Sequence, residues 1–115
     1  MQPIRQCLRT LVEESAHLHV VGEAADGLTA TQLVEALRPE VVLMDVHMGR
    51  LDGVTATQRI KAIIPQTLVI GLTAFPNPLV HEAMLRAGAY TTLGKDRLDE
   101  QLLTTIEHAF HSEPS

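Results

Sequence analysis

The pattern of hydrophobic and polar residues in this 115-residue chain alternates between two periods. Short continuous apolar runs, such as Val41-Val42-Leu43-Met44, are separated by longer segments in which apolar residues recur every three or four positions. Continuous runs of this length are typical of strands buried on both faces of a parallel sheet, and the longer spacing is typical of amphipathic helices. The pattern therefore predicts strands and helices in alternation.

The predicted elements alternate from residue 3 to residue 111. Helices are predicted at residues 3–15, 28–37, 54–63, 79–87 and 98–111, and strands at residues 17–23, 41–45, 67–72 and 90–93. Pro39, Pro65 and Gly88 fall between elements, where proline and glycine commonly end helices. Strict alternation favours one α/β domain at residues 1–111, with a parallel sheet covered by helices on both faces. Residues 112–115 are expected to form a disordered tail.

Composition and charge narrow the function classes that such a domain can serve. Apolar residues make up 45% of the chain and charged residues 20%, as in ordinary globular domains. The net charge is −5 and the nine Lys and Arg residues are scattered, so we expect no direct nucleic-acid binding. No apolar run approaches the roughly 20 residues of a membrane span. The single cysteine, Cys7, excludes an internal disulfide, and we expect a cytoplasmic domain without membrane contact.

Three predicted strands end at or just before a residue with a chemically active side chain. Asp45, Thr73 and Lys95 supply a carboxylate, a hydroxyl and an ammonium group. Because the carboxyl ends of parallel strands meet at one edge of a sheet, we expect these groups to gather there. They suit a phosphoryl-accepting site, in which the carboxylate is the nucleophile, the ammonium neutralises phosphoryl charge and the hydroxyl bonds to the product. Asp45 alone could equally be a residue that starts a turn.

At this point the chain resembles the receiver domain of bacterial two-component response regulators, especially the subgroup that usually carries a C-terminal helix-turn-helix. The resemblance covers nearly the whole chain, and it lies in the segments Gly22-Glu23-Ala24-Ala25-Asp26-Gly27, Arg38-Pro39-Glu40-Val41-Val42-Leu43-Met44-Asp45, Met48 with Asp52-Gly53, Leu72-Thr73-Ala74, and Ala87-Gly88-Ala89 leading to Lys95-Asp96. It implies a flavodoxin-like fold with strand order 2-1-3-4-5.

The resemblance also implies a function in phosphorelay signal transduction rather than an enzymatic activity. Asp45 would accept a phosphoryl group from a histidine kinase, Thr73 would be the switch hydroxyl, and Lys95 the lysine of the site. Mg²⁺ would be held by Asp45 and by the backbone carbonyl of His47. A face formed by residues 79–111 would then bind partners, and it could also hold a homodimer.

The beginning of the chain departs from the family pattern. The family starts with a hydrophobic strand that ends in two acidic residues, and these acids hold Mg²⁺; here residues 1–5 align with the first helix instead. We therefore expect an N-terminally truncated receiver that binds Mg²⁺ weakly. It should be unstable alone unless residues 18–23 pair with residues 41–45 or a partner fills the gap. The alternative is a degenerate receiver that acts as a phosphorylation-independent interaction or dimerisation module.

Other positions allow two interpretations. Met48-Gly49 replaces the usual Met-Pro pair, and Thr92 stands where the family usually has an aromatic residue that rotates inward on activation. Tyr90 could be a surrogate for that aromatic residue or could simply pack. The six histidines are better explained by strand, loop and helix-end positions than by a metal site. Asp52-Gly53 is most simply the start of the third helix.

Overall fold

The strands and helices follow the alternation seen in the sequence. The computed structural model describes residues 12–15, 18–47 and 52–111. In chain order its elements are α2 (Gly27–Leu37), β1 (Val41–Asp45), α3 (Gly53–Ile63), β2 (Leu68–Thr73), α4 (Pro78–Ala87), β3 (Thr91–Gly94), the 3₁₀ turn η1 (Lys95–Arg97) and α5 (Leu98–His111). The predictions for four helices and three strands in this part of the chain are confirmed, with each end within one residue of its expected place.

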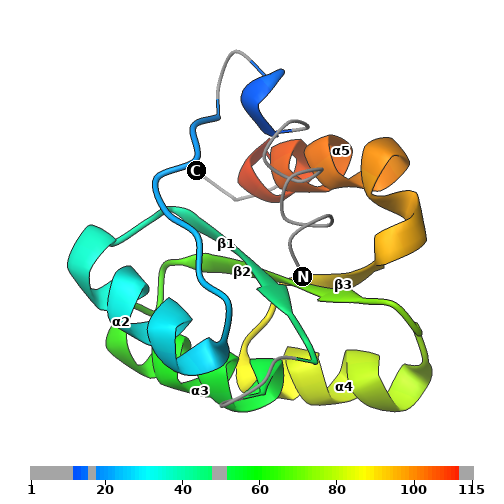
Figure 1. Cartoon of the computed structure of the whole chain (residues 1–115). Helices are drawn as coiled ribbons and strands as arrows, with labels where there is room; N and C mark the ends of the chain where they lie inside the picture. Colours follow the sequence, from blue (N-terminus) through cyan, green and yellow to red (C-terminus); the bar gives the residue numbers. More distant parts are fainter. Residues whose placement is uncertain (1–11, 16–17, 48–51, 112–115) are drawn as a thin grey trace.

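The described strands form one parallel sheet in the order β1-β2-β3. Asp45 at the end of β1 pairs with Leu72, and Thr73 at the end of β2 pairs with Gly94. The register therefore places the carboxyl ends of all three strands at the same edge. Figure 1 shows α5 on one face of this sheet and α2, α3 and α4 on the other. The α/β fold with helices on both faces is confirmed.

Alternation along the strands divides the core into two clusters. The side of the sheet that faces α2, α3 and α4, called here the three-helix side, buries Val34, Met44, Val46, Ala56, Ile60, Ile64, Val69, Met84 and Ala89. The side that faces α5, called the α5 side, buries Val12, Ile70, Leu72, Leu93, Leu98, Leu102 and Ile106. Neighbouring strand residues belong to opposite clusters because successive side chains of a strand point to opposite faces.

Local signals in the sequence explain where the helices begin and end. Three helices begin after a side chain that accepts a hydrogen bond from the backbone N–H of the third helical residue: Asp26 from Thr29, Asp52 from Thr55, and Asn77 from Val80. Such caps satisfy N–H groups that have no partner within the helix. Helix α4 ends at Gly88, whose φ of 113° is a left-handed conformation that favours glycine.

The strand predicted at residues 17–23 is wrong where the structure describes it, because residues 18–24 form neither helix nor strand. Leu18 and Val20 pack against the α5-side cluster, whereas Val21 is 60% exposed. The segment then passes α2, where Gly22 approaches the side chain of Leu37. The chain thus keeps the in-and-out alternation of a strand without the backbone ladder that defines one. In Figure 1 it runs from the α5 side to the three-helix side.

Several expectations concern residues outside the described ranges. The helix predicted at residues 3–15 is described only from residue 12, and residues 12 and 13 are helical. Cys7, Met48-Gly49 and the tail at residues 112–115 lie outside the described residues, so those predictions stay open. Within the described part of the chain, every helix is too short or too polar to cross a membrane.

Candidate functional site

The carboxylate of Asp45 and the ammonium group of Lys95 meet at the carboxyl edge of the sheet. Lys95 Nζ donates a hydrogen bond to Asp45 Oδ2 at 2.6 Å, although the two residues are 50 positions apart in the sequence. Their side chains are 13% and 21% exposed, so the ion pair is largely withdrawn from solvent while one side stays open to it. The expectation that these two strand ends come together is confirmed.

The other carboxylate oxygen of Asp45 is held from its own chain. The backbone N–H of His47 donates to Asp45 Oδ1 at 2.9 Å. Each oxygen therefore accepts one hydrogen bond and keeps lone pairs for another contact. Together the two bonds orient the carboxylate, because one fixes it to the loop after β1 and the other to the start of η1.

The backbone beneath Asp45 is packed against the first turn of α3. The N–H of Val46 donates to Leu72 O at 2.9 Å, and the N–H of Gly53 donates to Val46 O at 3.0 Å. A Cβ atom at Gly53 would lie only 2.5 Å from the carbonyl oxygen of Asp45 and 2.7 Å from Val46 Cα. Gly53 thus allows α3 to approach the peptide of the acidic residue directly.

Thr73 lies at the same edge but faces the other side of the sheet. Leu72 belongs to the α5-side cluster, so the next residue, Thr73, points to the three-helix side. Its buried hydroxyl accepts a hydrogen bond from the N–H of Phe75 at 3.2 Å. Among the hydrogen bonds found in the described residues, none joins Thr73 to Asp45 or Lys95. The structure therefore brings two of the three predicted residues into contact, with the third on the neighbouring strand.

Magnesium is the metal that the resemblance implies. Mg²⁺ prefers six oxygen ligands and is usually held by one or two carboxylates together with water and substrate phosphates. Asp45 offers a single carboxylate, which already bonds Lys95 and the N–H of His47. The described ranges contain no group of three or more His, Cys, Asp or Glu side chains that could hold a metal ion. The described residues alone do not make a dedicated Mg²⁺ site.

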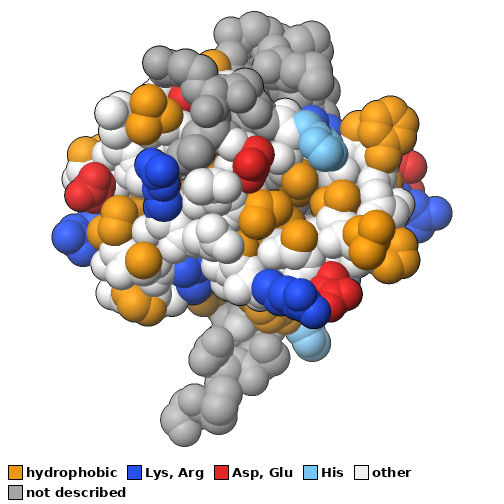
Figure 2. All heavy atoms as spheres, turned by 90° about the horizontal axis from the view of Figure 1, so that it is seen from below, with side chains coloured by type: hydrophobic (Ala, Val, Ile, Leu, Met, Phe, Trp, Pro, Cys, Tyr) orange, Lys and Arg blue, Asp and Glu red, His pale blue; other side chains and the backbone are white. Residues whose placement is uncertain are grey.

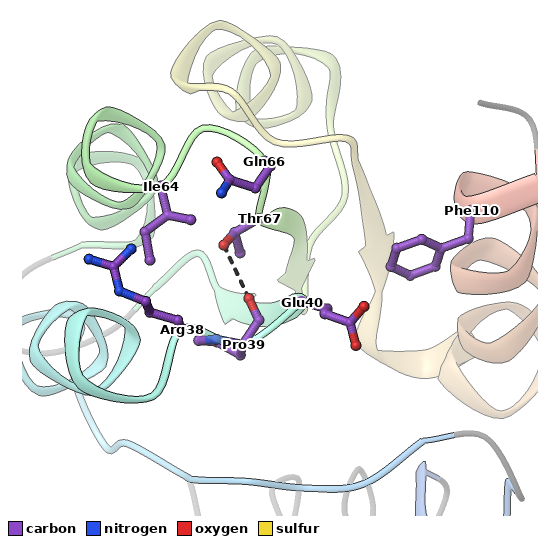
Figure 3. A pocket seen from close by; sticks show the side chains of 7 residues that line it. All are labelled: Arg38, Pro39, Glu40, Ile64, Gln66, Thr67 and Phe110. Atoms are coloured by element: carbon purple, nitrogen blue, oxygen red, sulfur yellow. Dashed lines mark hydrogen bonds between the residues drawn. The ribbon is translucent and has the colours of Figure 1, made fainter. Parts of the chain in front are cut away.

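A cavity of about 230 Å³ lies at the opposite edge of the sheet. Its lining consists of Arg38, Pro39, Glu40, Ile64, Gln66, Thr67 and Phe110 (Figure 3). Pro39 and Thr67 precede β1 and β2, and the hydroxyl of Thr67 donates to Pro39 O at 3.1 Å. The cavity therefore lies at the amino ends of the strands, and none of the predicted site residues lines it.

A parallel α/β sheet with an acidic residue at the carboxyl end of a strand is typical of phosphoryl-accepting signalling domains. Comparison with known proteins identifies the family. The sequence profile described as "Response regulator receiver domain" matches residues 1–107. The chain therefore belongs to the response regulator receiver domain family, whose members function in bacterial two-component systems. The resemblance to receiver domains that the sequence motifs indicated is confirmed.

Three relatives illustrate this membership. The chain is 34% identical over 110 residues to the transcriptional regulatory protein YxjL of Bacillus subtilis, an alignment that covers 96% of this chain and 50% of YxjL. The signal receiver domain of the response regulator NarL from Mycobacterium tuberculosis superposes with a TM-score of 0.90 at 26% identity, covering 97% of this chain and 90% of that one. The response regulator domain of Thermotoga maritima CheB gives a TM-score of 0.87 at 27% identity, covering 96% and 90%. These solved structures confirm the flavodoxin-like receiver fold.

The chain spans about half the length of the curated relative YxjL.

Two contacts near the site are not indicated by any motif in the sequence. One is the approach of Gly53 to the carbonyl of Asp45, which the Asp52-Gly53 pair suggested only as a helix start. The other is a hydrogen bond of 2.7 Å between His81 Nδ1 in α4 and Thr92 Oγ1 in β3. Residues 11 positions apart on a helix and a strand carry no shared periodicity, so no sequence signal could have found this bond.

Proposed function

We propose that this chain is a phosphorelay receiver that accepts a phosphoryl group on Asp45 from a histidine kinase. The observation that carries the proposal is the partly open Asp45–Lys95 ion pair at the carboxyl edge of the sheet. A carboxylate oriented by two hydrogen bonds, beside an ammonium group, has the nucleophile and the positive charge that phosphoryl transfer requires. Membership of the receiver family agrees with this assignment.

The proposed reaction moves one phosphoryl group between two side chains. A carboxylate oxygen of Asp45 forms a bond to phosphorus while the phosphorus–nitrogen bond to the kinase histidine breaks. The imidazole leaves with the bonding electron pair and later takes a proton from solvent. The product is an acyl phosphate on Asp45, so the chain is a phosphoryl acceptor and is assigned no further catalytic activity.

Lys95 and Thr73 would act on the charge that arrives with the phosphoryl group. The ammonium of Lys95 already bonds Asp45 Oδ2 and would turn to the phosphoryl oxygens as negative charge builds up there. Thr73 ends the strand that pairs with β1, and its hydroxyl would donate a hydrogen bond to the product. Phosphorylation adds charge and strong acceptor oxygens, which bias the equilibrium between two conformations.

The experiment is intact-mass measurement after incubation with acetyl phosphate, which is a small phosphoryl donor. We expect the wild type to gain the mass of one phosphoryl group and Asp45→Asn to gain none. Asp52→Asn is the matched control, because it makes the same substitution on an exposed acid nearby and Asn still caps α3. It should be phosphorylated like the wild type. Parallel reactions with Mg²⁺ and with a chelator measure how much the chain depends on the metal.

A second candidate function is a phosphorylation-independent interaction module. It is favoured by the absence, in the described ranges, of a group of three or more His, Cys, Asp or Glu side chains that could hold a metal ion. If the folded wild type and Asp52→Asn both stay unmodified with acetyl phosphate and with a phosphorylated kinase, this second function replaces the first.

Under either function we propose that residues 79–111 form the partner-binding face. Within that range Leu79, Leu85, Tyr90 and Phe110 are large hydrophobic side chains that are at least 40% exposed. These side chains lie on α4, on α5 and directly before the edge strand β3, and exposed apolar groups are found at many interaction surfaces. The view of the three-helix side in Figure 2 shows Lys and Arg side chains separated by other residues, with hydrophobic ones among them. A second copy of the chain is one proposed occupant, which light scattering at increasing protein concentration would test.

A further inference from the structure

We propose that two copies of this chain dimerise through the open edge of β1, with the two β1 strands antiparallel in one continuous sheet. The open edge consists of the backbone N–H and C=O groups of Val41, Leu43 and Asp45, which point away from β2. It is separate from the face formed by residues 79–111, and the pairing does not depend on phosphorylation of Asp45.

Strand β1 lies at the end of the sheet although its sequence is that of a strand with neighbours on both sides. Residues 41–44 form a continuous apolar run, which is typical of strands inside a parallel sheet. The central strand β2 is buried at every position except Leu68, whereas β1 is buried only at Met44. Strand β1 therefore keeps apolar side chains partly exposed, and the described part of the chain places no strand beside them.

The hydrogen bonds between β1 and β2 show which backbone groups form the open edge. The N–H of Leu68 donates to Glu40 O, and the N–H of Val46 donates to Leu72 O. In a parallel pair, residues that bond to a given neighbour alternate with residues whose N–H and C=O point away from it. The even-numbered residues therefore bond to β2. The odd-numbered residues Val41, Leu43 and Asp45 point outward.

The open edge is complementary to itself about Leu43. In an antiparallel pair centred on this residue, Leu43 and the partner's Leu43 exchange both N–H···O bonds. The N–H of Asp45 then faces the carbonyl of the partner's Val41. Gly53 closely approaches the carbonyl of Asp45, so this carbonyl is not assigned a bond to the partner. The contact is the same for both copies and closes on a dimer.

The side chains of β1 fit this arrangement. Val41 and Leu43 pack against the α5-side cluster, whereas Val42 and Met44 lie with the cluster on the three-helix side. The two-fold axis of the pair is perpendicular to the sheet, so each face of one sheet continues into the same face of the other. Dimerisation would therefore cover the partly exposed apolar side chains of β1 on both faces.

The charges and the backbone of β1 also favour a second copy as the occupant. Natural edge strands are commonly protected by lysine, proline or a β-bulge. Strand β1 contains neither lysine nor proline, and its register with β2 is unbroken from Val41 to Asp45. Its one charged residue, Asp45, is paired with Lys95 and lies opposite the partner's Val41. No like charges therefore meet across the two strands.

Residues 18–24 of the same chain are the competing occupant. Leu18 and Val20 pack against the same cluster as Val41 and Leu43. Among the hydrogen bonds of the described residues, none joins the backbone of residues 18–22 to β1. Closure of this segment would satisfy the open edge within one molecule. The two occupants can be distinguished, because pairing with a copy depends on protein concentration and closure does not.

The first measurement uses the unmodified protein. Light scattering gives the oligomeric state over a wide range of protein concentration, and NMR gives amide hydrogen exchange along β1. We expect a dimer to form as concentration rises and the exchange of Leu43 and Asp45 to slow with it. Val42 and Met44, which bond to β2, should be protected at every concentration.

Three outcomes of this measurement would overturn the inference. Protection of Leu43 and Asp45 in the monomer would assign the open edge to residues 18–24. A dimer in which these two amides still exchange rapidly would assign dimerisation to another surface. Growth beyond the dimer would indicate that β1 pairs with the other edge strand, β3, of a copy, since such a contact does not close.

The second measurement compares two substitutions at the centre of the open edge. Leu43→Pro removes the outward N–H, and Leu43→Ala is the matched control because it removes the same side chain but keeps the N–H. Proline is tolerated in an edge strand where its N–H is not used by the neighbouring strand. We expect the dimer Kd of Leu43→Pro to exceed that of Leu43→Ala by about tenfold or more, because each copy loses a donor.

Leu79→Ala tests the competing face formed by residues 79–111, because Leu79 is 80% exposed there. It should leave the dimer Kd unchanged. Equal values of Kd for Leu43→Pro and Leu43→Ala, or a dimer weakened by Leu79→Ala alone, would refute pairing through β1. Circular dichroism shows whether each variant is folded; if Leu43→Pro is not, the exchange of Leu43 and Asp45 in the unmodified protein decides.

Discussion

The two sides of the sheet are built from different kinds of contact. The α5 side is a cluster of aliphatic side chains centred on Ile70, Leu72 and Leu102. The buried polar residues found in the described chain are all threonines, at positions 31, 57, 67 and 73. Thr31 and Thr57 lie in α2 and α3, and Thr73 points to the three-helix side because its neighbour Leu72 packs on the α5 side. The three-helix side therefore combines apolar packing with buried hydroxyl groups.

This difference concerns how each side holds the fold together. Apolar packing is non-directional and strongly favours one close-packed arrangement, so it holds α5 and the sheet together as a base. Hydrogen bonds can exchange one partner for another at small net free energy. The hydroxyls of Thr73 and Thr92 lie on the three-helix side, beside α4. Both sides stabilise the fold through apolar packing, and in the described residues the three-helix side adds buried hydroxyl groups.

The largest expected effect comes from breaking the α5 side. Leu102 is fully buried, and Leu102→Ala removes side-chain volume that rigid neighbours cannot refill. We expect the free energy of unfolding to fall by about 2–5 kcal/mol, measured by denaturant unfolding. Leu79→Ala is the control, because Leu79 is 80% exposed and its truncation should change stability by less than about 0.5 kcal/mol. Equal losses for the two variants would contradict the contribution of Leu102 to the buried α5-side cluster.

A smaller effect is expected from Gly53→Ala, where α3 meets the peptide of Asp45. A new methyl group 2.5 Å from the carbonyl oxygen of Asp45 forces backbone to move. We expect a loss of about 1–3 kcal/mol in unfolding free energy together with slower phosphorylation by acetyl phosphate. Gly71→Ala is the comparison, since its methyl group meets the flexible end of Met84 first and should cost less. Unchanged phosphorylation in Gly53→Ala would show that this contact does not position Asp45.

The smallest expected effect is a gain in stability on the three-helix side. Thr57 is fully buried in α3, and its hydroxyl oxygen has no hydrogen-bond partner among the residues that the structure describes. Thr57→Val keeps the branched shape and removes an oxygen whose burial costs free energy. We expect stability to rise by about 1 kcal/mol, seen as a higher denaturant midpoint with the same m-value. A loss of stability would mean that the hydroxyl has a partner after all.

The elements that depend on neighbours in sequence were predictable. Continuous apolar runs located β1 and β2, and three- or four-residue spacing located the four described helices. Asp52, predicted to start the third helix, caps α3 in the structure, and Asp26 and Asn77 cap α2 and α4. These features follow from local backbone chemistry, which is why the sequence by itself determined them.

The meeting of Asp45 with Lys95 could also be predicted, although the two residues are far apart in the chain. It required only that the strands be parallel, because parallel strands bring their carboxyl ends to one edge. The roles assigned to Asp45, Thr73 and Lys95 in phosphoryl transfer remain proposals for the experiments above.

Tertiary structure alone decided which segments pair as strands and which side chains from different elements meet. Residues 18–23 have the alternation of a strand but form none, because a strand exists only where a neighbouring strand pairs with it. The bond between His81 and Thr92 depends on how α4 crosses β3, and the contact of Gly53 with Asp45 depends on how closely α3 approaches β1. Sequence determined where each element begins and ends, since those are local properties. The distances between elements decided how the site is supported.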